Sequence, residues 1–439
     1  MRTGARRSQP DDSGRIPEKG NYLKDIITIP KKHLVVGVLF AAVCLFNVLC
    51  TSRRQEGPVS DPYGEAYAGS AACVSCHKNI YDSIIHTAHW LDSRPASAQS
   101  IRGSFEPGRN RFSYRSSLSV VMERKDSGFY ETAYRNGRAY RTDTFGMVIG
   151  SGRKGQSYLY WRGEQLFQLP VSYFTPTDGW CNSPGYTPDS PFFDRRVPAS
   201  CLECHTTNAR TVFRGNQEYG DLFDKRQLVF GIDCEKCHGP GARHVAFHIE
   251  HPGETAGVYI INAGRLTRQQ QLDACALCHS GSRFPLKPAF SFRVGDRLND
   301  FSEAKYHEEN SAALDVHGNQ YGLLTASKCF AGSPLTCSTC HNPHANEAGD
   351  MKSFSRRCMS CHNGSLHKAC AMPPTSGLVL PDNCIDCHMP ALPSQKIVLG
   401  LSLTADMGSS ISNLVRTHRI AVYPAASLAY LKTLKAAPH

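Results

Sequence analysis

The 439-residue sequence predicts a mostly irregular fold of short helices, with an antiparallel β meander inserted and one apolar helix near the N-terminus. Three observations lead to this expectation. The pentapeptide Cys-x-x-Cys-His occurs seven times, and residues 105–175 alternate aromatic or β-branched residues with polar ones and lack both cysteine and histidine. In addition, residues 34–50 form an almost continuous apolar run.

The N-terminal part of the chain divides into three predicted segments. Residues 1–32 are polar and charged without apolar periodicity, which predicts a disordered cytosolic tail. Residues 33–50 are predicted to form a transmembrane anchor or signal segment, followed by a linker over 51–66. Charges precede the apolar run and no small-residue cleavage site follows it, which favours an anchor. A lipid on Cys50 and a cleaved signal remain open.

The seven pentapeptides, called attachment runs below and numbered in chain order, have the arrangement that attaches c-type haem. Two thiols add to the vinyl groups, and the adjacent imidazole binds the iron from one face. Zinc binding by paired cysteines is the main alternative, but it does not need a histidine after every pair. We therefore expect seven covalently attached haem c groups. The predicted cysteines are Cys73, Cys76, Cys201, Cys204, Cys234, Cys237, Cys275, Cys278, Cys337, Cys340, Cys358, Cys361, Cys384 and Cys387. The proximal iron ligands are His77, His205, His238, His279, His341, His362 and His388.

The rest of the chain is organised around these runs. Residues 67–104 form the first haem-binding segment, and 176–390 form a haem-binding domain with the other six runs. Between them, 105–175 is predicted as a haem-free antiparallel meander of about five to seven strands, because turn signals such as Asn136-Gly137 separate strand-like stretches. Residues 391–439 form a C-terminal tail with a candidate distal histidine, His418, and a final helix.

Twelve histidines lie outside the attachment runs, and they are candidates for the second face of each iron. An iron with imidazole on both faces is closed and suits electron transfer rather than substrate chemistry. We expect the distal ligands to come from His89, His244, His317, His344, His367, His418 and His248, with His86, His251 and His307 as weaker candidates. No catalytic residue is predicted.

The net charge of +11 does not indicate nucleic-acid binding. Residues 1–54 hold ten Lys/Arg and four acidic residues, so they account for +6 and leave +5 for the remainder. Haem propionates are acidic partners for that remaining excess of basic side chains. Thioether-linked haem belongs to a compartment outside the cytosol, so we expect the chain on the periplasmic or cell-surface side, anchored to the membrane.

Several stretches carry a family resemblance: YAGSAACVSCHKNIYDSIIHTAH, GIDCEKCHGPGARH, CSTCHNPH and NCIDCHMP. They resemble multihaem c-type cytochromes of the cytochrome c-554 type, a group related to the pentahaem and octahaem nitrite reductases and hydroxylamine oxidoreductases. The resemblance implies a multihaem cytochrome c fold with closely stacked haems. It also implies that His89, His244 and His344 are distal ligands. No Cys-x-x-Cys-Lys run occurs, so the lysine-ligated catalytic haem of the pentahaem enzymes is not expected.

These expectations favour a heptahaem electron carrier whose partners are other redox proteins or membrane quinol-linked complexes. The alternative is an enzyme, a multihaem reductase or oxidase of small nitrogen or sulfur compounds with one open-coordination haem. The sequence leaves open whether the chain is an enzyme.

Overall fold

A computed structural model describes most of the chain after residue 56. The described residues are 57–114, 117–125, 128–187, 189–213, 220–304, 314–365, 367–368, 370, 382–400 and 410–436. The predicted tail, the apolar segment and residues 51–56 of the linker therefore lie outside them, as does His307. Within the described residues, no helix combines the length and apolar character needed to cross a bilayer. The chain divides into residues 1–57 and 58–439, and the elements below belong to the second unit.

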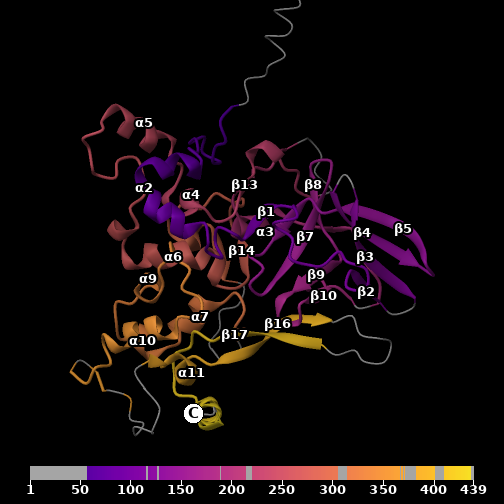
Figure 1. Cartoon of the computed structure of the whole chain (residues 1–439). Helices are drawn as coiled ribbons and strands as arrows, with labels where there is room; N and C mark the ends of the chain where they lie inside the picture. The colour runs from indigo at the N-terminus through magenta and orange to yellow at the C-terminus, as the bar shows by residue number, and fades with distance from the viewer. Residues whose placement is uncertain are drawn as a thin grey trace, which may run out of the picture. The chain divides into compact units, whose positions relative to one another are not determined.

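Short helices accompany the attachment runs, as predicted (Figure 1). Each run lies within a helix or overlaps its end, which turns the two cysteines of one run toward the same side. These helices are α2 (Ser70–Ile84), α3 (Ala199–His205), α4 (Cys234–His238), α6 (Arg268–His279), α9 (Cys337–Cys340), α10 (Met351–Met359) and α11 (Ile385–His388). The other helices are α5 (Ala242–Glu250), α7 (Gln320–Thr325), α8 (Lys328–Ala331) and α12 (Pro424–Ala436).

The first sheet is an antiparallel meander of four strands in chain order (Figure 1). Its strands are β2 (Arg111–Ser113), β3 (Leu118–Lys125), β4 (Gly128–Arg135) and β5 (Arg138–Thr144). The β4–β5 turn is the predicted Asn136-Gly137 hairpin, and both residues have positive φ, 51° and 77°. Asparagine and glycine tolerate that conformation better than other residues, so the local sequence sets this turn.

A second antiparallel sheet corrects the prediction of a single meander of five to seven strands. Eight described strands fall within 105–175, and they divide between two sheets. The second sheet takes in segments from outside that stretch, because alternation predicts strands but not their partners. It comprises β1 (Ser93–Pro95), β6 (Met147–Ile149), β7 (Gly155–Arg162), β8 (Gln165–Gln168), β9 (Val171–Phe174), β10 (Gly179–Asn182) and β11 (Arg195–Arg196).

The two sheets share a core rich in aromatic side chains. Tyr158, Tyr160 and Phe167 from the second sheet and Phe112 from the first are almost completely buried in one apolar cluster. Close packing of such large rings stabilises this part of the chain without any cofactor. Three two-stranded sheets complete the described structure: β12 (Thr206–Asn208) with β13 (Val229–Phe230), β14 (Arg283–Pro285) with β15 (Ser302–Ala304), and β16 (Ala391–Gly400) with β17 (Ser410–Arg416).

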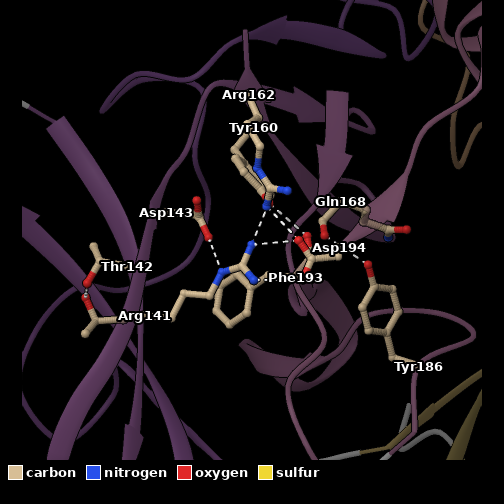
Figure 2. Close-up of polar contacts among 10 residues, drawn as sticks. Arg141, Thr142, Asp143, Tyr160, Arg162, Gln168, Tyr186, Phe193 and Asp194 are labelled. Carbon is tan, nitrogen blue, oxygen red and sulfur yellow. Dashed lines mark hydrogen bonds and ion pairs between the residues drawn. The ribbon is translucent and has the colours of Figure 1, made fainter. Parts of the chain in front are cut away.

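An ion-pair cluster joins the two large sheets (Figure 2). The Arg141 guanidinium on β5 donates to both oxygens of Asp194 at 2.8 and 3.1 Å, and Arg162 on β7 donates to Asp194 at 2.6 Å. Arg141 also donates to Asp143 and to the Tyr160 hydroxyl, both at 2.8 Å. Asp194 directly precedes β11, so the cluster also fixes the chain that enters the second attachment run.

We expect Asp194→Asn to lower the free energy of unfolding at neutral pH by about 1 kcal/mol, a small effect because the side chain is 45% exposed. Hydrogen bonds and charge from Arg141 and Arg162 lower the pKa of Asp194 to about 2, from an ordinary value of 3.8. The contribution is therefore complete above the ordinary value and is lost as the pH falls through about 2.

Urea denaturation of both proteins at pH 7 and at pH 2 measures this. Asp82→Asn, which removes an exposed carboxylate paired with Lys78 within one helix, is the control and should change stability less. A difference between Asp194→Asn and the parent that is as large at pH 2 as at pH 7 would contradict the assignment.

Candidate haem-binding sites

The histidines of several attachment runs are oriented through one ring nitrogen. Nδ1 of His238 lies 2.8 Å from the carbonyl oxygen of Ile261, and Nδ1 of His388 lies 2.9 Å from that of Ala421. A carbonyl oxygen can only accept, so Nδ1 carries the proton in both rings. The lone pair of Nε2 is then free, which is the tautomer that binds a metal and the usual second contact of a metal-bound histidine.

Three histidines of attachment runs each have a second imidazole about 6 Å away that is distant in the sequence. His238 lies opposite His344 with ring centres 6.0 Å apart and planes at 11°, and His341 lies 6.1 Å from His418 at 31°. His279 lies 6.1 Å from His89 at 64°. Imidazole nitrogens bonded at about 2 Å on either side of one metal place the ring centres about 6 Å apart. The three spacings therefore match two rings that share one iron.

Burial keeps five of the rings in these pairs neutral, those of His89, His279, His341, His344 and His418. Removal from water and, to a smaller extent, the neighbouring charge of His341 together lower the pKa of His418 to about 4. The same cause, loss of solvent, lowers the pKa of His89, His279, His341 and His344. At neutral pH each of these rings therefore offers a lone pair rather than a second proton, as an iron ligand must.

His205 of the second run differs from the histidines just described. Its Nδ1 lies 2.7 Å from an oxygen of Asp92, an acceptor that carries a full negative charge. Burial lowers the pKa of His205, but the hydrogen bond and charge of Asp92 more than offset this, so the pKa is raised overall. His317, another predicted ligand, lies close enough to His205 and His279 to feel their charge, and burial lowers its pKa.

The predicted pair on α5 is oriented for a ligand, although in the described part of the chain no ring contact joins it to a histidine of an attachment run. Nδ1 of His244 lies 2.8 Å from the carbonyl oxygen of Val258, and its ring lies 4.5 Å from that of His248 one helical turn later. The Nε2 atom of His248 is buried and has no hydrogen-bond partner. An unpaired buried nitrogen is costly unless something binds it, so this atom fits a metal-ligand role.

Other predicted histidines are less clearly placed. His367 lies 5.5 Å from His362, but Gly364 donates its N–H to the His367 carbonyl at 3.1 Å and closes a tight turn between them. Five residues reach about 18 Å only when fully extended, so this turn leaves no path around a porphyrin. His251 is exposed and stacks on Phe247. In the described part of the chain, no other histidine ring contacts His77 or His388.

Thiols from different attachment runs lie against one another. Every described cysteine is free of a disulfide bond. Hydrogen-bond contacts join Cys73 to Cys234, Cys204 to Cys278, Cys275 to Cys337 and Cys358 to Cys384. Cys237 and Cys275, and likewise Cys340 and Cys361, are near enough for their charges to interact through space. Hydrogen bonds and these weaker interactions together link all seven runs.

Two buried carboxylates, which the sequence analysis missed, position the first three runs. Glu235 accepts hydrogen bonds from the backbone N–H groups of Ala68, Gly69 and Gly241, at 2.7 to 2.9 Å. Asp233 accepts from the hydroxyls of Ser70 at 2.7 Å and Thr207 at 3.0 Å. An aspartate directly before a helix is a recognisable capping signal. The burial of Glu235 has no local signal, because its partners lie 166 and 167 residues away.

The residues present fit covalently bound haem c better than a structural zinc ion. Among the described residues, no three histidine, cysteine or acidic side chains are grouped as one metal centre. A haem iron needs only two protein ligands, and paired neutral imidazoles supply them. The thiols of each run then remain available for the vinyl groups.

Comparisons with known proteins agree with this chemistry. A family model described as cytochrome c554 and c-prime matches residues 190–239, which include the second and third runs. The multiheme cytochrome MtrA of Shewanella baltica (strain OS185) is 23% identical over 181 residues, covering 37% of this chain. The match spans about half of that relative, 52% of its length. No solved structure matches significantly. The comparisons confirm the predicted resemblance to multihaem c-type cytochromes and support haem c as the cofactor.

The structure predicts that Gly231→Ala disturbs the segment that carries His89. Gly231 has φ of +69°, and an added Cβ would lie 2.4 Å from the carbonyl oxygen of Trp90. Its neighbour Ile232 donates an N–H to the carbonyl of His89 at 2.9 Å. Backbone strain and overpacking together should lower the free energy of unfolding by about 2 kcal/mol or more.

Urea denaturation of the haem-loaded protein measures this loss. Gly253→Ala is the matched control, because its added Cβ meets nothing within 4 Å. Equal free energies of unfolding for the two variants would contradict the prediction. They would show that the 89–93 segment shifts to make room for the added Cβ.

Proposed function

We propose that this chain, with its resemblance to multihaem c-type cytochromes, binds seven haems c and carries electrons between redox partners outside the cytosol. Haem c supplies one-electron oxidation and reduction of its iron. The observation that carries the proposal is that hydrogen bonds and weaker electrostatic interactions between attachment cysteines link all seven runs, six in one series and the second as a branch at the fourth. Electron transfer between centres requires such proximity, whereas separate substrate sites do not.

The contacts also support an order for the series. They run from the first attachment run to the third, fourth, fifth, sixth and seventh, and the second run joins at the fourth. This order differs from the chain order only at the second run. We propose that electrons follow it, with the second run as a side branch.

The imidazole pairs support closed iron centres, which suit a carrier. We propose the pairs His238–His344, His341–His418 and His279–His89 as axial ligands of the third, fifth and fourth runs. His317 is the candidate partner of His205, on the basis of their electrostatic contact. His244, His248 and His367 remain candidates for the other irons. Substrate reduction would instead need an iron with one open coordination position. That alternative therefore predicts a high-spin centre in the spectrum of the unaltered protein.

The partners and location belong to the same proposal. We propose anchoring by residues 33–50, or by lipid at Cys50, and exchange of electrons with other redox proteins or membrane quinol-linked complexes. Three considerations support it: thioether haem attachment belongs to a compartment outside the cytosol, the apolar segment follows a basic pair, and MtrA is named a multiheme cytochrome.

Mass spectrometry of protein matured in a host that attaches haem c tests the haem number directly. We expect the polypeptide mass plus seven haems, resistant to acid extraction because the thioether bonds are covalent. A mass with fewer haems, or with zinc in their place, contradicts the proposal.

Magnetic and optical spectra test the ligand pairs. His344→Ala, His418→Ala and His89→Ala should each convert one low-spin centre to high-spin, because each removes one of two imidazoles from an iron. His251→Ala is the control and should change no centre, since that ring is exposed and stacked on Phe247. Unchanged low-spin spectra in the three variants would refute the pairs. A high-spin centre in the unaltered protein would favour the enzyme alternative.

A further inference from the structure

One histidine of an attachment run has a charged second contact where its counterparts have neutral ones. Nδ1 of His205 lies 2.7 Å from the Asp92 carboxylate. The equivalent atoms of His238, His362 and His388 lie against backbone carbonyls, and that of His279 lies 3.3 Å from the amide oxygen of Gln320. Among these described contacts, only the second run pairs its imidazole with an anion.

The backbone holds Asp92 in this position from two sides. Its N–H donates to the carbonyl of His89 at 3.1 Å, and its carbonyl accepts from Gly150 at 2.5 Å. Asp92 directly precedes β1, which pairs with β6, so the large sheet sets where this carboxylate points. The side chain is only 23% exposed, so solvent screens its charge incompletely.

We propose that Asp92 is a positioning residue that gives the second run a lower reduction potential than the fourth. This inference rests on haem attachment as proposed above. A carboxylate that accepts from Nδ1–H makes Nε2 a stronger electron donor, and its charge favours the more positive, oxidised iron. The neutral amide oxygen of Gln320 beside His279 strengthens Nε2 as a donor less and adds no negative charge to stabilise the oxidised iron.

The positions of the second and fourth runs indicate the direction of electron transfer that this difference in potential favours. Cys204 of the second run contacts Cys278 of the fourth, and the turn that carries Asp92 also carries His89, which faces His279. With haem bound at both runs, one electron would pass from the second centre, which would be oxidised, to the fourth, which would be reduced, with no bond made or broken. The electron reaches the second centre from an external reductant, a redox protein or a quinol-linked complex. The second run is thus the place where electrons enter the series.

A redox titration of the haem-loaded full chain, followed optically and by magnetic resonance, tests the inference. Asp92→Asn keeps an acceptor oxygen but removes the charge, so one of the one-electron steps should move to higher potential by at least tenfold in its equilibrium constant, about 59 mV. Asp92→Glu should restore most of the shift. Asp224→Asn is the matched control, because Asp224 is 21% exposed and pairs with Arg226 instead of an imidazole.

The converse variant guards against a misfolded Asp92→Asn protein. Gln320→Glu introduces a carboxylate beside Nδ1 of His279 and should move one step to lower potential. If both variants carry all their haems and neither shifts a step, the inference is wrong while the proposed function stands. If the unaltered protein lacks covalent haem, the proposed function itself fails.

Discussion

The arrangement of the described structure depends on the two buried carboxylates that flank Cys234. Asp233 and Glu235 are 6% and 4% exposed, and burial raises the pKa of Glu235. Such burial is unfavourable unless every oxygen finds donors, and here backbone N–H groups and hydroxyls supply them. The donors come from the segment entering the first run, the strand leaving the second and the turn after the third. One short helix thereby fixes the mutual positions of three attachment runs.

Different interactions from those around Asp233 and Glu235 stabilise the β region. Its aromatic core and the Arg141–Asp194 cluster hold two sheets together with protein groups alone. The haem-binding part has short helices and small sheets, and its described apolar clusters away from the sheets are small. A bound porphyrin would supply the apolar surface that such segments lack. The sheets thus offer a rigid support, and Asp92 shows how that support reaches an iron site, since β1 begins one residue later.

Local patterns in the sequence predict local features well. The attachment runs, the Asn136-Gly137 hairpin and the one-turn spacing of His244 and His248 all follow from short-range chemistry. Such local patterns do not predict which histidines face each other when they lie far apart in the sequence. His344 lies three residues after His341, too close to reach the opposite face of the same porphyrin, and it instead faces His238. The sequence likewise does not predict a carboxylate beside His205, because Asp92 lies 113 residues away.

The facing imidazoles also bear on how the chain would mature if it is exported as proposed. His344 follows His238 by 106 residues and His418 follows His341 by 77, so in an N-terminus-first passage the cysteines of these runs emerge well before the second ligands. His89, in contrast, emerges long before His279. Newly attached porphyrins of the third and fifth runs would thus wait with one face uncovered, whereas that of the fourth would meet its second ligand at once. Under the proposed location and ligand pairs, the timing of translocation, and not only the final fold, would decide which centres are exposed to small molecules during maturation.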